Sequence, residues 1–298
     1  MEQPSTGHDS VLLDEVLTYL VPATGKIIVD CTLGRGGHAA EIARRVGPHG
    51  QVLAIDLDQR NLEYARQSME GMPCRFFNAN FAQFDEVLDA AGISAVDGIL
   101  ADLGVSTNQL FEDEYGMSFS RDMPLDMRLD RSAGPSAADV VNRMDAESLA
   151  NVLYELAQER YSRRIARKIV EARLISPIVS TGRLAEIVRM AIPKRGGAPE
   201  RIDPATRTFL ALRMHVNREM ENLKRLIELG AKALRRGGRL VVISFQSMED
   251  RLVKQQFRSL EQAGAVRILT GKPVVPSEAE TARNPRSRSA KLRAVEKC

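Results

Sequence analysis

The sequence has few cysteines and no long apolar segment. It contains 3 cysteines in 298 residues, and none of them lies in a Cys-x-x-Cys pattern. We therefore expect neither a complete disulfide framework nor a structural zinc site, but a metal-free protein of the reducing cytoplasm. No apolar run is long enough to cross a bilayer, and residues 2–9 lack the basic-then-apolar order of a secretory signal, so no membrane association is expected.

Charge is distributed unevenly along the chain, although the formal net charge is only +3. Residues 85–130 contain eleven acidic and two basic side chains, a net charge of −9. Residues 160–201 contain eleven basic and three acidic side chains, a net of +8, and residues 283–298 have a net of +5. Two basic blocks on a nearly neutral chain favour a polyanionic partner, although solvated helix faces are the alternative.

The first hundred residues alternate short apolar runs with helical patterns. Strands are predicted at residues 26–32, 51–58, 74–81 and 96–103, with helices at 39–46, 61–69 and 84–91 between them. These strands are apolar throughout, which is typical of a parallel sheet covered by helices on both faces. A further apolar strand is predicted at 239–245 and an edge strand at 290–295, so the fold class is α/β with a mostly parallel, doubly wound, Rossmann-like sheet.

A helical segment interrupts this alternation. Helices are predicted at residues 146–158, 161–174 and 181–191, and another begins at Asp203-Pro204, with Asp as N-cap and Pro at the first helical position. Its apolar face extends to Leu223. The predicted organisation is a first part of the α/β domain at 1–110, an inserted all-helical domain for substrate recognition at 111–211, and a second α/β part with a basic tail at 212–298. Residues 273–289 are expected to form a loop.

The turn after the first strand is rich in glycine. The strand ends in Asp30, and Gly34, Gly36 and Gly37 follow before a helix begins. Glycines in this position allow a ligand to approach the backbone closely, as in nucleotide-binding turns. Ala39 takes the third position of a dinucleotide motif and is tolerated there, so the spacing alone leaves NAD and a dehydrogenase open. The carboxylate of Asp30 favours a cationic sulfonium ligand over a pyrophosphate, which points to S-adenosyl-L-methionine.

Polar and aromatic residues follow the other predicted strands. Asp56 and Asp58 end the second strand, and either carboxylate can accept hydrogen bonds from ribose hydroxyls or cap the next helix. Phe81 offers an aromatic face for an adenine ring, or a core side chain. Asp102 ends the fourth strand. Because ligands bind at the carboxyl ends of parallel strands, Asp102 is well placed to contact both cofactor and substrate.

Eight separate blocks of this sequence resemble one family. The first four are His8-Asp-Ser-Val-Leu-Leu-Asp-Glu15, Gly34-Arg-Gly-Gly-His38, Asp97-Gly-Ile-Leu-Ala-Asp-Leu-Gly-Val-Ser106 and Pro124-Leu-Asp-Met-Arg128. The other four are Pro204-Ala-Thr-Arg-Thr-Phe209, Gly237-Gly-Arg-Leu-Val-Val-Ile-Ser-Phe245, Glu249-Asp-Arg251 and Asn284-Pro-Arg-Ser-Arg-Ser-Ala-Lys-Leu-Arg293. They span nearly the whole chain in the same order as in the bacterial small-subunit ribosomal RNA cytosine-N4 methyltransferases, the RsmH or MraW family.

This resemblance implies a class I methyltransferase that uses S-adenosyl-L-methionine and takes part in ribosome biogenesis. Its substrate would be the N4 amine of one cytidine in the decoding region of 16S rRNA, within the small ribosomal subunit. Asp102 is the candidate catalytic residue, as acceptor of a hydrogen bond from N4. The family's cofactor-binding residues correspond to Gly36, Gly37, His38, Asp56, Phe81, Asp102 and Gln109. The resemblance thus selects Asp56 over Asp58, and it is the sole argument for His38 and Gln109.

This chain departs from the family pattern at two positions. Gln246 stands where relatives carry His, and Cys31 stands where they usually carry Gly. A histidine that contacts RNA is replaceable by the glutamine amide, whereas a catalytic histidine would be lost here. Two other functions stay open: a methyltransferase for protein or small molecules, which the acidic segment at 85–130 would suit, and an RNA-binding assembly factor without chemistry.

Overall fold

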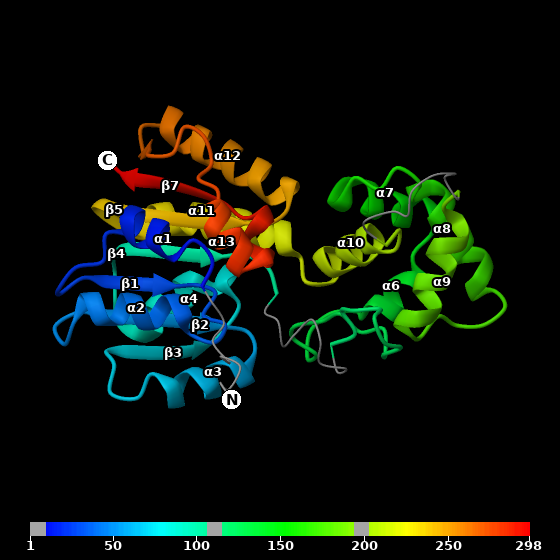
Figure 1. Cartoon of the computed structure of the whole chain (residues 1–298), viewed down its shortest axis with the longest axis horizontal. Helices are drawn as coiled ribbons and strands as arrows, with labels where there is room; N and C mark the ends of the chain where they lie inside the picture. Colours follow the sequence, from blue (N-terminus) through cyan, green and yellow to red (C-terminus); the bar gives the residue numbers. More distant parts are fainter. Residues whose placement is uncertain (1–9, 106–114, 194–202) are drawn as a thin grey trace. The chain divides into compact units, whose positions relative to one another are not determined.

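The structure is a computed structural model that describes residues 10–105, 115–193 and 203–298. The chain divides into two compact units (Figure 1). The first unit combines residues 1–104 with residues 220–298, and the second consists of residues 105–219. The predicted inserted segment, 111–211, falls within the second unit. Among the described residues, no helix is both long enough and apolar enough to cross a membrane.

A seven-stranded sheet forms the centre of the first unit, in the order β3-β2-β1-β4-β5-β7-β6. Its strands are β1 (Ile27–Asp30), β2 (Gln51–Asp56), β3 (Cys74–Asn78), β4 (Val96–Asp102), β5 (Leu234–Ser244), β6 (Val266–Ile268) and β7 (Lys291–Lys297). The pairs from β3 to β5 are parallel, and β7 pairs antiparallel with both β5 and β6. The predicted Rossmann-like, mostly parallel α/β class is confirmed.

Helices cover both faces of this sheet (Figure 1). They are α1 (Leu13–Leu20), α2 (Gly37–Val46), α3 (Gln59–Ser68), α4 (Phe84–Ala91), α11 (Glu219–Ala233) and α12 (Ser247–Gln262). Ile28 and Val52 pack with α1, α2 and α3, whereas the alternate residues Val29 and Leu53 pack with α4, α11 and α12. Because both faces are buried, every strand position favours an apolar residue, which explains why the strands were recognisable without alternation.

Several predicted elements of the first unit were wrong in detail. β3 ends at Asn78, because Asn80 accepts a hydrogen bond from the Ala82 amide and starts the 3₁₀ helix η1 (Phe81–Gln83). The predicted edge strand at 290–295 is β7, which lies inside the sheet, since the three-residue strand β6 pairs with its outer side. The predicted loop at 273–289 contains α13 (Glu278–Arg283) and the 3₁₀ helix η2 (Pro285–Ser289).

The second unit is helical and has its own core. Its helices are α6 (Ala137–Arg143), α7 (Ala146–Ala157), α8 (Ser162–Arg173), α9 (Thr181–Ala191) and α10 (Thr206–Val216). The single helix predicted from Asp203 to Leu223 is in fact two helices, α10 and α11. They are separated at Arg218, whose φ of 49° lies in the left-handed region that a continuing helix cannot contain. Asp203 accepts a hydrogen bond from the Ala205 amide at 2.8 Å, but α10 begins at Thr206 with Ala205 as its N-cap, so the predicted N-cap at Asp203 was wrong by two residues.

Truncation of a core residue under α11 tests this packing. Leu226 is fully buried in the cluster that joins α11 to the sheet, so Leu226→Ala should lower the free energy of unfolding by about 2–5 kcal/mol through the cavity it leaves. Lys224→Ala, on the exposed side of the same helix, should change it by less than about 0.5 kcal/mol. Urea unfolding followed by circular dichroism measures both, and equal effects would contradict the packing.

Candidate functional site

Three aspartates meet at one edge of the first unit's sheet. Asp30 is the last residue of β1, Asp56 of β2 and Asp102 of β4. β1 pairs in parallel with both β2 and β4, so the three strand ends lie side by side. The carboxyl edge of a parallel sheet is where α/β folds bind ligands.

The glycine turn runs along this edge between β1 and α2. Gly34 (φ 52°) and Gly36 (φ 85°) adopt left-handed backbone conformations that disfavour other residues. A Cβ at Gly36 would lie 2.8 Å from Met69 Sδ, so the turn also packs closely on the segment after α3. The backbone conformation therefore disfavours larger residues at Gly34 and Gly36, and at Gly36 a larger residue would also require Met69 to move.

Asp56 holds the glycine turn against β2. Its Oδ2 accepts hydrogen bonds from the Gly34 amide at 2.7 Å and from Asn61 Nδ2 at 3.2 Å, and its Oδ1 accepts one from the Asp58 amide. Burial raises the pKa of Asp56 to about 6, although these hydrogen bonds oppose the shift. Asp58 has a different role, because it caps α3 by accepting a hydrogen bond from the Arg60 amide.

Asp30 is buried and Asp102 is partly buried, with 23% of its side chain exposed. Within the described part of the chain, Asp30 Oδ2 and Asp102 Oδ1 have no hydrogen-bond partner, and no Lys or Arg forms an ion pair with either residue. Burial raises the pKa of Asp30 to about 7 and, with the nearby charges of Asp30 and Glu249, that of Asp102 to about 8. This edge would bind a cation favourably, since a positive charge there stabilises the ionised carboxylates.

His38 lies beside Asp102 near the start of α2. Its Nε2 donates a hydrogen bond to the Val11 carbonyl at 2.9 Å, and its Nδ1 lies 3.7 Å from Asp102 Oδ2. Burial lowers the pKa of His38 to about 4. Because Asp102 is largely protonated and His38 neutral near pH 7, the contact is not an ion pair. The bond to Val11 fixes the tautomer and leaves Nδ1 turned towards Asp102.

The remaining predicted positions differ in how the structure places them. Phe81 begins η1 and is partly buried against the core on the α4 side of the sheet. Gln109 lies outside the described residues. Cys31 is buried in the core and does not line the edge. Gln246 is the N-cap of α12, two residues after the end of β5, and its backbone amide donates to Glu249 Oε2 at 3.0 Å.

Thr32 contributes to this edge and was missed in the sequence. Its Oγ1 accepts a hydrogen bond from the Asp102 amide at 2.6 Å, and its own amide donates to Asp30 Oδ1 at 3.1 Å. An Asp followed two residues later by Thr at a strand end is a turn pattern, which gives a local signal. The partner on β4, seventy positions away, has no local signal.

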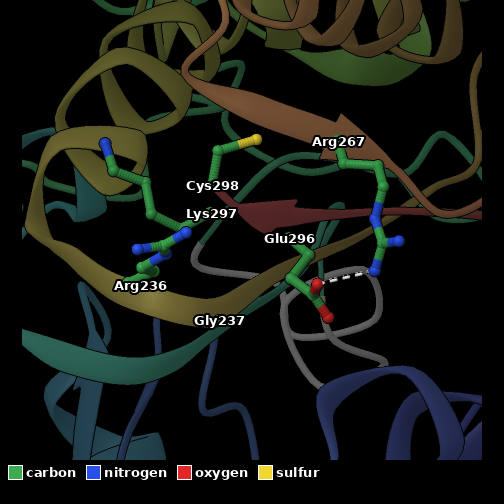
Figure 2. A pocket seen from close by; sticks show the side chains of 6 residues that line it. All are labelled: Arg236, Gly237, Arg267, Glu296, Lys297 and Cys298. Atoms are coloured by element: carbon green, nitrogen blue, oxygen red, sulfur yellow. Dashed lines mark hydrogen bonds and ion pairs between the residues drawn. The ribbon is translucent and has the colours of Figure 1, made fainter.

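A surface pocket of about 390 Å³ lies at the opposite edge of the sheet (Figure 2). It is lined by Arg236, Gly237, Arg267, Glu296, Lys297 and Cys298. These residues flank the amino end of β5, which pairs with the amino end of β4. Glu296 pairs with Arg267 there (Figure 2) and also with Arg239. The pocket is therefore separate from the aspartates at the carboxyl edge.

Fold and edge together define the class of protein. The parallel strands followed by an antiparallel β7, the glycine turn, and the carboxyl groups without Lys or Arg partners in the described residues would suit a cationic nucleoside-type ligand. No group of three or more His, Cys, Asp or Glu residues suited to a metal ion occurs in the described segments. These features are those of an S-adenosyl-L-methionine-dependent methyltransferase.

Comparison with known proteins identifies the family. The MraW methylase family matches residues 5–298, and the chain belongs to it. Similar curated proteins, each named ribosomal RNA small subunit methyltransferase H, occur in Geotalea uraniireducens (44% identical), Trichlorobacter lovleyi (45%) and Geobacter sulfurreducens (46%). Each comparison covers 97% of this chain and 98% of the relative. The resemblance seen in the sequence is confirmed, and the cofactor is S-adenosyl-L-methionine.

The raised carboxyl pKa values predict a pH dependence for cofactor binding. A ligand with a sulfonium and an ammonium group favours ionised Asp30, Asp56 and Asp102, whose pKa values are about 7, 6 and 8. Binding should therefore release protons and become tighter as the pH rises from about 6 to about 8. Titration calorimetry in two buffers of different ionisation enthalpy measures the release. An affinity that is constant over this range, without proton release, would contradict the shifts.

Proposed function

We propose that this chain methylates the N4 amine of one cytidine in the decoding region of 16S rRNA, within the small ribosomal subunit. The observation that carries the proposal is Asp102 at the end of β4, beside the glycine turn, whose Oδ1 atom is buried without a hydrogen-bond partner in the described residues. The names of the similar proteins direct the choice of small-subunit ribosomal RNA as substrate. The assignment of N4 rests on the family resemblance and on the chemistry that Asp102 offers.

The cofactor would be held along the carboxyl edge. Gly36 and Gly37 leave room for it above the turn, Asp56 offers lone pairs to the ribose hydroxyls, and Phe81 offers an aromatic face to the adenine. Gln109 completes the proposed set of contacts together with His38 and Asp102. Bound S-adenosyl-L-methionine supplies a methyl group that its sulfonium makes electrophilic.

The protein's main chemical contribution is at Asp102. The lone pair of a cytosine amine is delocalised into the ring, so the amine is a weak nucleophile. An ionised Asp102 accepts a hydrogen bond from N4, keeps the lone pair free for the methyl group and takes up the proton that the amine loses. Orientation accounts for most of the remaining acceleration. A stacked cytosine must first rotate out of the RNA to reach this edge.

An RNA-binding surface is proposed on α8 of the second unit. Ser162, Ile165 and Ile169 face the core of that unit, which leaves the opposite side of the helix exposed. That exposed side carries Arg163, Arg164, Arg167 and Lys168, of which Lys168 pairs with Glu171. No acidic partner of the three arginines is found in the described residues. Such a side fits the phosphates of an RNA backbone.

The predicted basic tail is less available than its composition indicates. Arg293 is buried and pairs with Asp250 at 2.6 Å, and Lys291 pairs with the same carboxylate. Lys297 donates to the Ala231 carbonyl at 2.7 Å. These cations belong to β7 and stabilise the fold of the first unit. We therefore place the main RNA contact on α8.

Replacement of Asp102 tests the chemistry. Asp102→Asn keeps the size of the side chain but cannot accept a proton, so the transfer rate should fall by about 10²–10⁴-fold. In the wild type, kcat/KM for S-adenosyl-L-methionine should rise with pH through about 8, because this ratio reports the ligand-free protein and the ionised form of Asp102 is the active one. Asp58→Asn, which alters a helix cap, serves as the control and should retain activity.

The measurement uses S-adenosyl-L-methionine with a deuterated methyl group. Wild type and variants are incubated with small ribosomal subunits, with purified 16S rRNA and with total protein, and nucleosides and peptides are analysed by mass spectrometry. Label in N4-methylcytidine from the wild type alone supports the proposal. Label in protein or in another nucleoside, or equal labelling by Asp102→Asn, would show that the assignment is wrong.

Charge reversal on α8 tests the RNA surface. Arg163→Glu, Arg164→Glu and Arg167→Glu together should weaken binding to the small subunit, and the slope of log affinity against log salt should become shallower by about 2–3, since each phosphate contact contributes about 0.9. The same change of net charge on the exposed side of α11, at Lys224, Arg225 and Lys232, is the control. Equal losses in both variants would exclude a specific role for α8.

A further inference from the structure

β1 and β4 separate immediately after their last backbone hydrogen bond. β1 and β4 pair up to Asp30 and Leu100, and the Cys31 amide still donates to the Leu100 carbonyl at 2.9 Å. Beyond this bond the chain from β1 turns away into the glycine turn. The next β4 amide on the side of β1 is that of Asp102. It has no backbone carbonyl to bond with in the described residues, and it donates to Thr32 Oγ1 at 2.6 Å instead.

We infer that Thr32 is a positioning residue for methyl transfer, whose hydroxyl fixes Asp102 relative to the glycine turn. The inference rests on the proposed role of Asp102. Thr32 lies within the turn that would hold the cofactor, and its hydroxyl bonds the backbone of the residue that would hold the substrate amine. One side chain thus links the two groups that must be aligned for the reaction.

Contacts on the other side of Thr32 strengthen this link. The Thr32 amide donates to Asp30 Oδ1 at 3.1 Å. Thr32 therefore contacts both strand ends: its hydroxyl bonds the backbone of Asp102, and its amide bonds the side chain of Asp30. An alanine or a valine at this position would keep the amide contact to Asp30 but lose the hydroxyl bond to Asp102.

Loss of the hydroxyl should affect the reaction more than cofactor binding. Thr32→Val keeps the side-chain volume but leaves the buried Asp102 amide without an acceptor, which favours a shift of the β4 end towards another partner. A displacement of about 1 Å in a reacting group costs on the order of 10²-fold in rate. The glycine backbone and Asp56, which would hold the cofactor, keep their own hydrogen bonds.

The structure offers a closely matched control. Thr270 is buried in the same unit, and its Oγ1 accepts a hydrogen bond from the amide of Ala294 on β7 at 3.0 Å. Thr270→Val therefore removes the same kind of bond, from a buried threonine to a strand amide. Thr270 neighbours the strand β6, whose partner is β7, and none of the three site aspartates contacts it in the described structure.

The test compares wild type, Thr32→Val, Thr32→Ser and Thr270→Val. Single-turnover methyl transfer gives the rate, calorimetry gives the Kd of S-adenosyl-L-methionine, and a thermal melt gives Tm. We expect Thr32→Val to lose about 10- to 100-fold in rate, with Kd changed by less than about threefold. Thr32→Ser, which retains the hydroxyl, should keep most of the rate, and Thr270→Val should lower Tm comparably while leaving the rate unchanged.

Two results would overturn the inference. One is a Thr32→Val protein with the wild-type rate, and the other is an equal loss of rate in Thr32→Val and Thr270→Val, which would reduce Thr32 to a structural residue. A failure of the proposed function itself is distinct, because it appears in the wild type as the absence of label at cytidine N4. The comparison among the variants applies to whichever acceptor the wild type methylates.

Discussion

The complete or partial burial of three carboxyl groups at one sheet edge, with no Lys or Arg of the described residues paired with Asp30 or Asp102, is the constraint on which this site depends. Asp30 and Asp102 have raised pKa values chiefly because burial disfavours their ionised forms. The native state therefore holds more protons than the unfolded chain between about pH 4 and pH 8. Their contribution to stability is complete below about pH 4 and is lost as the pH rises through about 7 to 8. A bound cationic ligand stabilises the ionised carboxylates. The edge that lowers the stability of the ligand-free fold as the pH rises therefore strengthens cofactor binding.

The surroundings keep these groups both buried and correctly placed. Asp56 holds the glycine turn through the Gly34 amide, and Thr32 holds the end of β4 against the same turn. His38 remains neutral beside Asp102 because its own pKa is lowered by burial. A protonated histidine there would neutralise the charge that the ligand should meet. The site thus combines a negative potential with little positive charge of its own, a combination suited to a sulfonium.

Much of this arrangement was predictable from the sequence, for reasons that are specific to each element. The strands β1, β2 and β4 are buried on both faces, so each appears as an apolar run, and α4 and α9 were predicted with the bounds they have.

The short strand β6 was missed because three residues carry no periodic pattern. The break between α10 and α11 was missed because the apolar spacing continues across Arg218. Asp56 and Asp58 were equivalent in the sequence, and the structure gives them different partners. The bond from Thr32 to Asp102 joins residues from different strands and follows from tertiary structure alone.

The most direct measurement of the central claim is a carbon-13 NMR titration of the aspartate carboxyl groups, with and without S-adenosyl-L-methionine. Asp30→Asn and Asp102→Asn proteins assign the two resonances. In the ligand-free protein these groups should titrate near pH 7 and pH 8, and with the cofactor bound their pKa values should fall well below 7. Ligand-free pKa values near 4, the ordinary range for aspartate, or values that the cofactor leaves unchanged, would contradict the account.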